Sequence, residues 1–170
     1  GESYLAYAKN QIKDFLREKK QKAIFIPYAA VTFSFAEYEK KVNEAFADIG
    51  HHVIGIHRFD HPAEAIENAD AIVVGGGNTW HLVKMLQDNK LIEAIRKKAK
   101  EGTPYIGWSA GANIACPTLK TTNDMPIVEP AKFDTLGLIP FQINPHYTDE
   151  HPTNFSGETR EVRINEFITV

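Results

Sequence analysis

The fold of this 170-residue chain is decided around residues 103–116, which read TPYIGWSAGANIAC. Thr103 to Trp108 is a short apolar segment typical of a buried strand, and a helical run of small residues follows Ser109. Within it, Gly107-Trp108-Ser109-Ala110-Gly111 fits the pattern G-x-S-x-G, in which a serine stands on a tight turn between a strand and a helix. The stretch therefore predicts a parallel α/β sheet that presents Ser109 at the carboxyl end of a strand.

Ser109 has two interpretations, a nucleophile or a serine that merely begins a helix. The turn of a nucleophile elbow is strained, and a side chain in place of Gly107 or Gly111 would collide with adjacent backbone. A helix that starts there also directs its free N–H groups and positive dipole end at the site, which favours developing negative charge. Because a strand and a helical run flank the motif as the elbow requires, we favour the nucleophile.

Strands and helices alternate along the rest of the chain. The predicted strands are 23–26, 52–57, 71–74 and 103–108. The predicted helices are 4–16, 34–49, 62–69, 79–88, 91–100 and 159–168. Such alternation implies right-handed crossovers and a mostly parallel sheet with helices on both faces. We therefore expect a doubly wound α/β fold in a single domain over residues 1–170.

Two features depart from this regular pattern. The stretch 117–152 is irregular and carries six prolines, and segments of this kind inside a domain often build sites. The chain also begins in a helix, although doubly wound domains usually open with a strand, and residues 167–170 could lead into another strand. We therefore expect an N-terminal strand and a C-terminal segment beyond the two ends.

A glycine run, Gly75-Gly76-Gly77-Asn78, follows the predicted strand 71–74 at the same sheet edge as Ser109. The dinucleotide pattern G-x-G-x-x-G is not satisfied, because Trp80 stands where the last glycine is required. Two interpretations remain open. The run is either a plain tight turn or a loop whose backbone amides approach an oxyanion.

A serine nucleophile needs a base, and the chain offers seven histidines. His146 follows the apolar segment 138–143, so a strand could deliver it to the sheet edge as another strand delivers Ser109. His151 is a weaker candidate, and the other five histidines are expected to be structural or solvated. His146, Asp149 and His151 could also bind a metal, but no second residue to orient them is evident, and we predict no metal site.

Composition restricts the possible partners. A net charge of −3 from interleaved acids and bases leaves no basic stripe for phosphates, so nucleic acid is not expected. There is no run of about 18 apolar residues to cross a membrane and no N-terminal signal segment, which predicts a soluble, intracellular protein. Cys116, the single cysteine, excludes an internal disulfide and lies in an apolar run typical of a buried structural thiol.

The chain resembles the peptidase E family, the α-aspartyl dipeptidases among the serine peptidases. The segments that carry the resemblance are 23–27, 55–58, 75–79, 106–113, 121–128, 142–146 and 157–161. The resemblance implies a three-layer sandwich like that of class I glutamine amidotransferases. It also implies a cytoplasmic enzyme without a cofactor that hydrolyses small acidic peptides with an N-terminal aspartate. We expect the protein to be a monomer or a homodimer.

The resemblance also assigns roles to particular residues. Ser109 matches the family's nucleophile and His146 its general base. Gly77 matches a position whose backbone N–H serves the oxyanion hole, and the amide of Ala110 would be the second donor. Asp124 matches an aspartate implicated in activity, although a glutamate further along the family's chain, beyond the last residue here, competes for the role of the third triad member.

An aspartyl side chain needs a cation in the pocket. Arg160 is our hypothesis, since guanidinium pairs bidentately with carboxylate, and a solvated arginine in a first helical turn is the alternative. Asn78 is a further substrate-binding candidate. The competing functions are a cyanophycinase-like peptidase for β-aspartyl bonds and an inactive relative that binds acidic peptides. A glutamine amidotransferase is disfavoured, because its elbow needs a cysteine where Ser109 stands.

Overall fold

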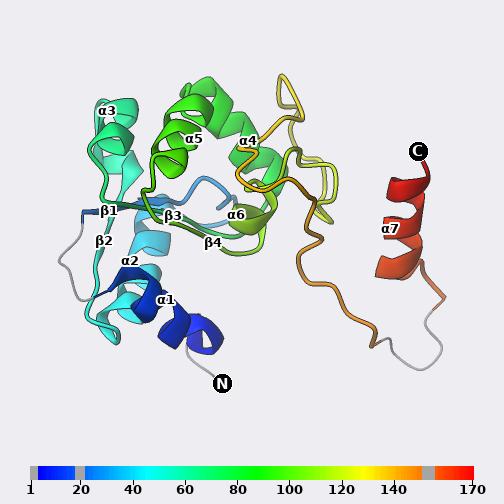
Figure 1. The fold of residues 1–170 in the computed structure, drawn as a ribbon, viewed down its shortest axis with the longest axis horizontal. Helices are drawn as coiled ribbons and strands as arrows, with labels where there is room; N and C mark the ends of the chain where they lie inside the picture. Colours follow the sequence, from blue (N-terminus) through cyan, green and yellow to red (C-terminus); the bar gives the residue numbers. More distant parts are fainter. Residues whose placement is uncertain (1–3, 18–21, 151–155) are drawn as a thin grey trace.

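The computed structural model describes residues 4–17, 22–150 and 156–170. Four parallel strands form one sheet in the order β2-β1-β3-β4 (Figure 1). The strands are β1 (Ala23–Ile26), β2 (Val53–Gly55), β3 (Ala71–Val74) and β4 (Tyr105–Gly107). In register, Ala23 lies opposite Val53 on one side and Ala71 on the other. All four predicted strands are confirmed, although β2 is shorter than 52–57 because the chain turns into a 3-10 helix at Ile56.

The helices also follow the predicted pattern. They are α1 (Lys9–Leu16), α2 (Phe35–Ala47), α3 (Pro62–Glu67), α4 (Thr79–Asp88), α5 (Ile92–Lys100), α6 (Ala110–Asn113) and α7 (Arg160–Thr169), with 3-10 turns η1 (Ala6–Ala8) and η2 (Ile56–Arg58). Helix α2 begins at a complete capping box, in which the Ser34 hydroxyl accepts from the Glu37 N–H and the Glu37 carboxylate accepts from the Ser34 N–H.

Side chains of the strands alternate between two cores, one on each face of the sheet. Ile24 and Ile72 face the core that α3, α4 and α5 cover, whereas Phe25 and Val73 face the core that α1 and α2 cover. Figure 1 shows these two helical groups on opposite sides of the sheet. The two cores make both sides of the central strands apolar, which confirms the predicted doubly wound, three-layer fold.

The strand order creates a switch point between the two central strands. The chain runs from β1 outward to β2, then returns across the sheet to β3 and β4. The loops after β1 and β3 consequently meet, and the Asn78 N–H donates to the Ala29 carbonyl at 2.9 Å. Ligands of open α/β sheets bind at the carboxyl ends of the strands at such a point.

One expectation for the region after β4 is wrong, since segment 138–143 forms no strand. The predicted helix after Ser109 is present as α6 but ends at Asn113, and one set of backbone bonds explains both findings. The N–H groups of Leu136, Gly137 and Leu138 donate to the carbonyls of residues 114, 116 and 115. The carbonyls of residues 114–116 therefore accept from residues 136–138 and not from a continuing helix. The segment that starts at Leu136 consequently pairs with this turn and not with the sheet.

Helix α7 lies away from the sheet in Figure 1, at the far end of the molecule from α3. None of its residues is fully buried. Its start is fixed by Thr159, whose hydroxyl accepts from the Val162 N–H at 3.2 Å. Side chains of this helix line two small cavities together with residues of the segment 120–124.

Candidate active site

Ser109 lies at the carboxyl end of β4 and precedes α6. Its backbone has φ 53° and ψ −113°, a region in which a residue other than glycine is strained by about 1–3 kcal/mol. The hydroxyl makes no capping bond to α6. Instead, Ser109 Oγ lies 2.8 Å from Nε2 of His146. Ser109 therefore stands at the start of α6, but its side chain faces His146 and does not cap the helix.

The glycines of the motif have the steric role expected of them. A Cβ on Gly107 would lie 2.4 Å from the carbonyl oxygen of Gly111, and a Cβ on Gly111 would lie 2.3 Å from that of Val74. The expected dipole contribution is smaller than predicted, because α6 has only four residues. What the turn offers is the N–H of Ala110, which donates no hydrogen bond within the described part of the chain.

His146 is held by an irregular loop and not by a strand. Its backbone is left-handed, with φ 62°. Asn123 Nδ2 donates to the Pro145 carbonyl at 3.0 Å, and Asn144 Nδ2 donates to the Thr121 carbonyl at 2.9 Å. These bonds tie the histidine loop to the segment 121–123, so that segment fixes where the imidazole lies.

Asn113 connects the histidine loop to the elbow itself. This residue of α6 is fully buried, and its Nδ2 donates to the Ile143 carbonyl at 3.0 Å and to the Thr121 hydroxyl at 3.1 Å. Sequence reasoning missed Asn113, Thr121 and Asn123 as supporting residues. A buried amide one turn after the nucleophile is the signal that could have identified Asn113, because a buried amide needs partners.

The glycine run approaches Ser109 closely. A Cβ on Gly76 would lie 2.8 Å from Cβ of Ser109. Gly77 has φ 137°, and a Cβ there would lie 2.3 Å from the carbonyl oxygen of Ala29. The N–H of Gly77 donates no hydrogen bond within the described residues. The run therefore lies against the nucleophile at Gly76, and the next residue carries a backbone N–H that the described residues leave unused.

Asp124 lies in the same site but bonds to another element. Its Oδ2 accepts from the Thr79 N–H at 2.7 Å, the Thr79 hydroxyl at 2.6 Å and the Thr122 hydroxyl at 3.0 Å. Among the described residues no hydrogen bond joins Asp124 to His146. The carboxylate thus caps the first residue of α4 and holds the segment 122–124 against it.

Asn78, the predicted second substrate-binding residue, is the N-cap of α4. Its Oδ1 accepts from the His81 N–H at 3.0 Å, and its Nδ2 donates to the Met125 carbonyl at 2.8 Å. One of the two protons on Nδ2 has no acceptor in the described part of the chain. Asn78 does not line the cavity at Ser109.

A cavity of about 220 Å³ lies over the nucleophile. Its lining residues are Thr79, Ser109, Ala110, Thr122, Asn123, Asp124, Pro145, His146 and Arg160. The cavity thus brings together the predicted nucleophile, base, carboxylate and cation from four separate parts of the chain. Arg160 is half-buried in the first turn of α7, and its guanidinium has neither an ion pair nor a hydrogen bond within the described residues.

Two other predictions concern residues near the site. Cys116 is fully buried, its Sγ accepts from the Ile143 N–H at 3.2 Å, and burial raises the pKa of its thiol, as expected for a structural cysteine. Asp149 accepts a hydrogen bond from the Tyr147 hydroxyl at 2.7 Å. The described residues contain no cluster of three or more side chains suited to a metal, and His151 lies outside them.

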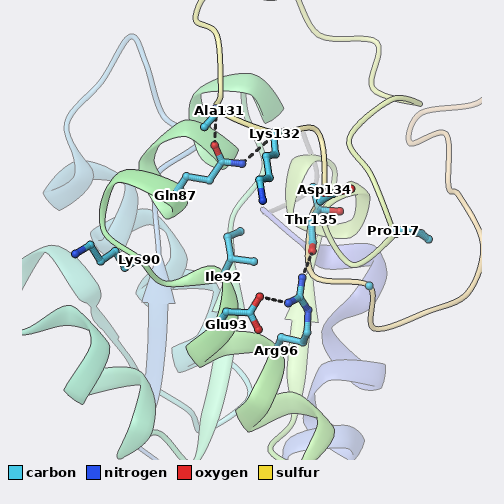
Figure 2. A pocket seen from close by; sticks show the side chains of 11 residues that line it. Gln87, Lys90, Ile92, Glu93, Arg96, Pro117, Ala131, Lys132, Asp134 and Thr135 are labelled. Atoms are coloured by element: carbon cyan, nitrogen blue, oxygen red, sulfur yellow. Dashed lines mark hydrogen bonds and ion pairs between the residues drawn. The ribbon is translucent and has the colours of Figure 1, made fainter.

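A larger cavity, of about 650 Å³, lies elsewhere, between α4, α5 and the segment 131–137 (Figure 2). Figure 2 shows Gln87 bridging to Ala131 and Lys132, and Arg96 bridging to Glu93 and Thr135. Gln87 donates to the carbonyl of residue 132 and accepts from the N–H of residue 131. The side chains of Gln87 and Arg96 are therefore already committed to holding a loop.

None of the described helices has the length and apolarity needed to span a membrane.

The family model of peptidase family S51 matches residues 1–170. Peptidase E of Nostoc sp. (strain PCC 7120 / SAG 25.82 / UTEX 2576) is 54% identical over 170 residues, which are 100% of this chain and 70% of that protein. Peptidase E of Salmonella arizonae is 49% identical over 100% of this chain and 74% of that protein.

Solved structures show the same architecture. A candidate peptidase E from Listeria monocytogenes EGD-e matches with a TM-score of 0.71 and 25% identity, over 98% of this chain and 83% of that one. A peptidase from an acI-B1 Actinobacterium matches with a TM-score of 0.58 and 19% identity, over 85% of this chain and 63% of that one, and supports the fold alone. With the family model and two relatives matched over its whole length, the chain belongs to peptidase family S51 and is a serine peptidase.

Proposed function

We propose that this peptidase hydrolyses dipeptides with an N-terminal aspartate, Asp-Xaa, through an acyl-enzyme on Ser109. The observation that carries the proposal is the 2.8 Å contact between Ser109 Oγ and His146 Nε2 in a cavity that Arg160 also lines. The names of the relatives give the class of enzyme, and the cation in this cavity is what points to an acidic substrate. We also propose that the enzyme is cytoplasmic and acts as a monomer or homodimer.

The first step is attack by Ser109 Oγ on the carbonyl carbon of the Asp-Xaa bond. For this, His146 must be neutral with its proton on Nδ1, so that Nε2 accepts the hydroxyl proton. The protonated imidazole then gives that proton to the leaving amine, and the C–N bond breaks. Water, deprotonated by the same Nε2, then attacks the ester carbonyl; the C–Oγ bond breaks, the imidazolium returns the proton to Ser109 Oγ, and aspartate is released. His146 thus acts as base and acid in turn.

The oxyanion of the tetrahedral intermediate would be held by the N–H groups of Gly77 and Ala110. Both groups are unused by the described residues, and the close approach of Gly76 to Ser109 brings the glycine run against the nucleophile. Preorganised donors of this kind typically contribute a factor of about 10²–10³ each to kcat. Both donors belong to the backbone, so their directions depend on the loops that carry them.

Asp124 would act as the acidic member through its charge. It lines the same cavity as His146 but has three other hydrogen-bond donors and none from the imidazole. A carboxylate in the cavity favours the imidazolium that forms during attack, even without a direct bond. Its bonds to Thr79 and Thr122 also hold the segment that ends at Asn123, which anchors the histidine loop.

Arg160 and Asn78 would recognise the substrate. The free guanidinium of Arg160 can pair with the aspartyl carboxylate through two parallel N–H···O bonds. Asn78 lies outside this cavity, so its uncommitted Nδ2 proton would donate to a part of the substrate that extends beyond it. A cavity of about 220 Å³ has room for a short side chain. Both features favour aspartate over larger or neutral residues at the substrate's N-terminus.

The decisive experiment is a comparison of Asp-Leu, β-Asp-Leu and Glu-Leu as substrates, with Ser109→Ala as the control. We expect Asp-Leu to be cleaved fastest and Ser109→Ala to lose a factor of about 10⁴ or more in kcat. Faster cleavage of β-Asp-Leu would favour a cyanophycinase-like enzyme. Binding of all three peptides without turnover would indicate an inactive relative, and equal turnover by Ser109→Ala would exclude Ser109 as the nucleophile.

A further inference from the structure

Tyr38 makes a hydrogen bond to the glycine run. It lies on α2, is 2% exposed, and its hydroxyl donates to the Gly76 carbonyl at 2.9 Å. The ring lies so close to the loop that a Cβ on Gly75 would be 2.7 Å from the Tyr38 oxygen. The glycine at position 75 is therefore what lets this hydroxyl reach the loop.

The carbonyl that Tyr38 holds belongs to the same peptide unit as the N–H of Gly77. A peptide unit is planar, and in the trans form its C=O and N–H point in opposite directions. A bond that fixes the Gly76 oxygen therefore fixes the direction of the Gly77 N–H as well. Because glycines flank this unit, few steric barriers would otherwise stop it from rotating.

The Tyr38 hydroxyl also accepts a hydrogen bond, from the hydroxyl of Tyr4. Trp108 Nε1 donates to the Tyr4 oxygen at 2.8 Å, and the Tyr4 and Tyr38 oxygens lie 3.0 Å apart. Each hydroxyl has one proton, and the proton of Tyr38 goes to Gly76, so Tyr4 donates to Tyr38. The chain of donors thus runs in one direction, from Trp108 to the Gly76 carbonyl, and its members strengthen one another.

This chain connects the two halves of the catalytic site. Trp108 directly precedes Ser109 on the elbow after β4, whereas Gly76 lies in the loop after β3. Tyr38 is fixed between them by edge-to-face contacts with Phe25 and Phe33, at ring-centroid distances of 5.0 Å and 5.2 Å. A rigid aromatic cluster therefore sets the position of the oxyanion loop relative to the nucleophile.

We propose that Tyr38 is a positioning residue for catalysis, whose hydroxyl aims the Gly77 N–H at the oxyanion by holding the Gly76 carbonyl. The inference rests on the proposed role of Gly77 in the oxyanion hole. It assigns to a buried helix residue, 38 positions before the glycine it holds, a part in stabilising the transition state.

The test is Tyr38→Phe, which removes the hydroxyl and keeps the ring. We expect kcat for Asp-Leu to fall about 10- to 100-fold with KM nearly unchanged, which is less than the loss of a whole oxyanion donor. The boronic acid analogue of aspartate, whose tetrahedral adduct on Ser109 carries an oxygen in the oxyanion position, should lose affinity by about the same factor. Titration of Ser109 with diisopropyl fluorophosphate counts the active sites, so that kcat refers to folded enzyme.

Tyr28→Phe is the matched control. Tyr28 is 4% exposed, close to the value for Tyr38, and its hydroxyl has no hydrogen bond within the described residues. We expect its kcat to stay within about 2-fold of the parent, since it holds no oxyanion donor. If Tyr38→Phe does not fold, Tyr4→Phe tests the same chain one step earlier, with a smaller fall in kcat and no change in KM.

The outcomes separate this inference from the proposed function. If the parent enzyme does not cleave Asp-Leu, the substrate assignment fails, and the rate at which diisopropyl fluorophosphate modifies Ser109 in Tyr38→Phe and in the parent still reports on Tyr38, because that reagent carries no aspartyl group. If the parent cleaves Asp-Leu and Tyr38→Phe keeps both its kcat and its boronate affinity, the positioning role alone is wrong. A fall in thermal stability with unchanged kcat per titrated site would likewise reduce Tyr38 to a packing residue.

Discussion

The two cavities described above differ in what their polar groups do. In the cavity of about 650 Å³, the side chains of Gln87 and Arg96 donate hydrogen bonds to backbone carbonyls of segment 131–136 (Figure 2). In the cavity of about 220 Å³ at Ser109, the guanidinium of Arg160 and the backbone N–H of Ala110 have no partner within the described residues. In the smaller cavity these unused donors lie beside the Ser109–His146 pair, which has no counterpart in the larger one.

The two cavities also differ in the role of the residues that have a strained, positive-φ backbone. Ser109 and His146 both have positive φ, at 53° and 62°, and they face one another across the small cavity. At the large cavity the corresponding residue is Lys90, with φ 56°, and its exposed side chain has no partner within the described residues. Strain that brings two reactive groups together differs from strain that only ends a helix, and substitutions should distinguish the two.

The largest effect is expected at His146. Asparagine tolerates a left-handed backbone, so His146→Asn keeps the loop conformation while removing the base. We expect kcat for Asp-Leu to fall by a factor of about 10⁴–10⁶, with the melting temperature nearly unchanged. Steady-state kinetics and thermal melting measure the two effects separately.

Lys90→Asn is the matched substitution at the large cavity. It places the same residue at a similar left-handed φ, where asparagine is better tolerated than lysine. The activity of this variant should equal that of the parent. If Lys90→Asn lost activity as His146→Asn does, the functional division between the two cavities would be wrong.

An intermediate effect is expected at Arg160. In Arg160→Ala, kcat/KM for Asp-Leu should fall about 100-fold, because the bidentate pair with the aspartyl carboxylate is lost. Arg160→Lys should recover only part of it, since an ammonium cannot pair through a planar fork. Arg163→Ala is the control one turn along α7, where the side chain faces Glu158 at 3.6 Å. Parent-like cleavage of Asp-Leu by Arg160→Ala would assign that arginine to the solvated surface.

The sequence was sufficient for the sheet because its signals are local. Strands 23–26 and 71–74 were predicted to the residue, since apolar runs buried on both faces end abruptly at Pro27 and Gly75. The region after β4 was not predictable in this way. Its N–H groups pair with carbonyls about 20 residues earlier, and such long-range bonds leave no periodic pattern in the chain.

The candidate site likewise has a part that local sequence predicts and a part that depends on long-range contacts. Ser109 and its flanking glycines form a local steric pattern, so the sequence contains the whole elbow. Tyr38, by contrast, has the spacing of an ordinary apolar helix residue, and its bond to Gly76 exists only because β1 and β3 are neighbours in the sheet. Partners brought together by strand order cannot be recognised from either segment alone.

The smallest effect on activity is expected at Arg96, in the large cavity, where the effect on stability should be clear. Arg96 donates to the carbonyls of Thr135 and Leu136 at 2.7 and 2.8 Å, and both of these residues are buried. Arg96→Ala would leave the two carbonyls without their donors, at a cost of about 1–3 kcal/mol in the free energy of unfolding, measured by urea denaturation. At 25 °C, kcat for Asp-Leu per titrated Ser109 should stay at the parental value, because those bonds hold a loop remote from the nucleophile. A loss of kcat at full occupancy of folded enzyme would mean that the large cavity communicates with the small one through the turn at 114–116, whose carbonyls accept from the same loop.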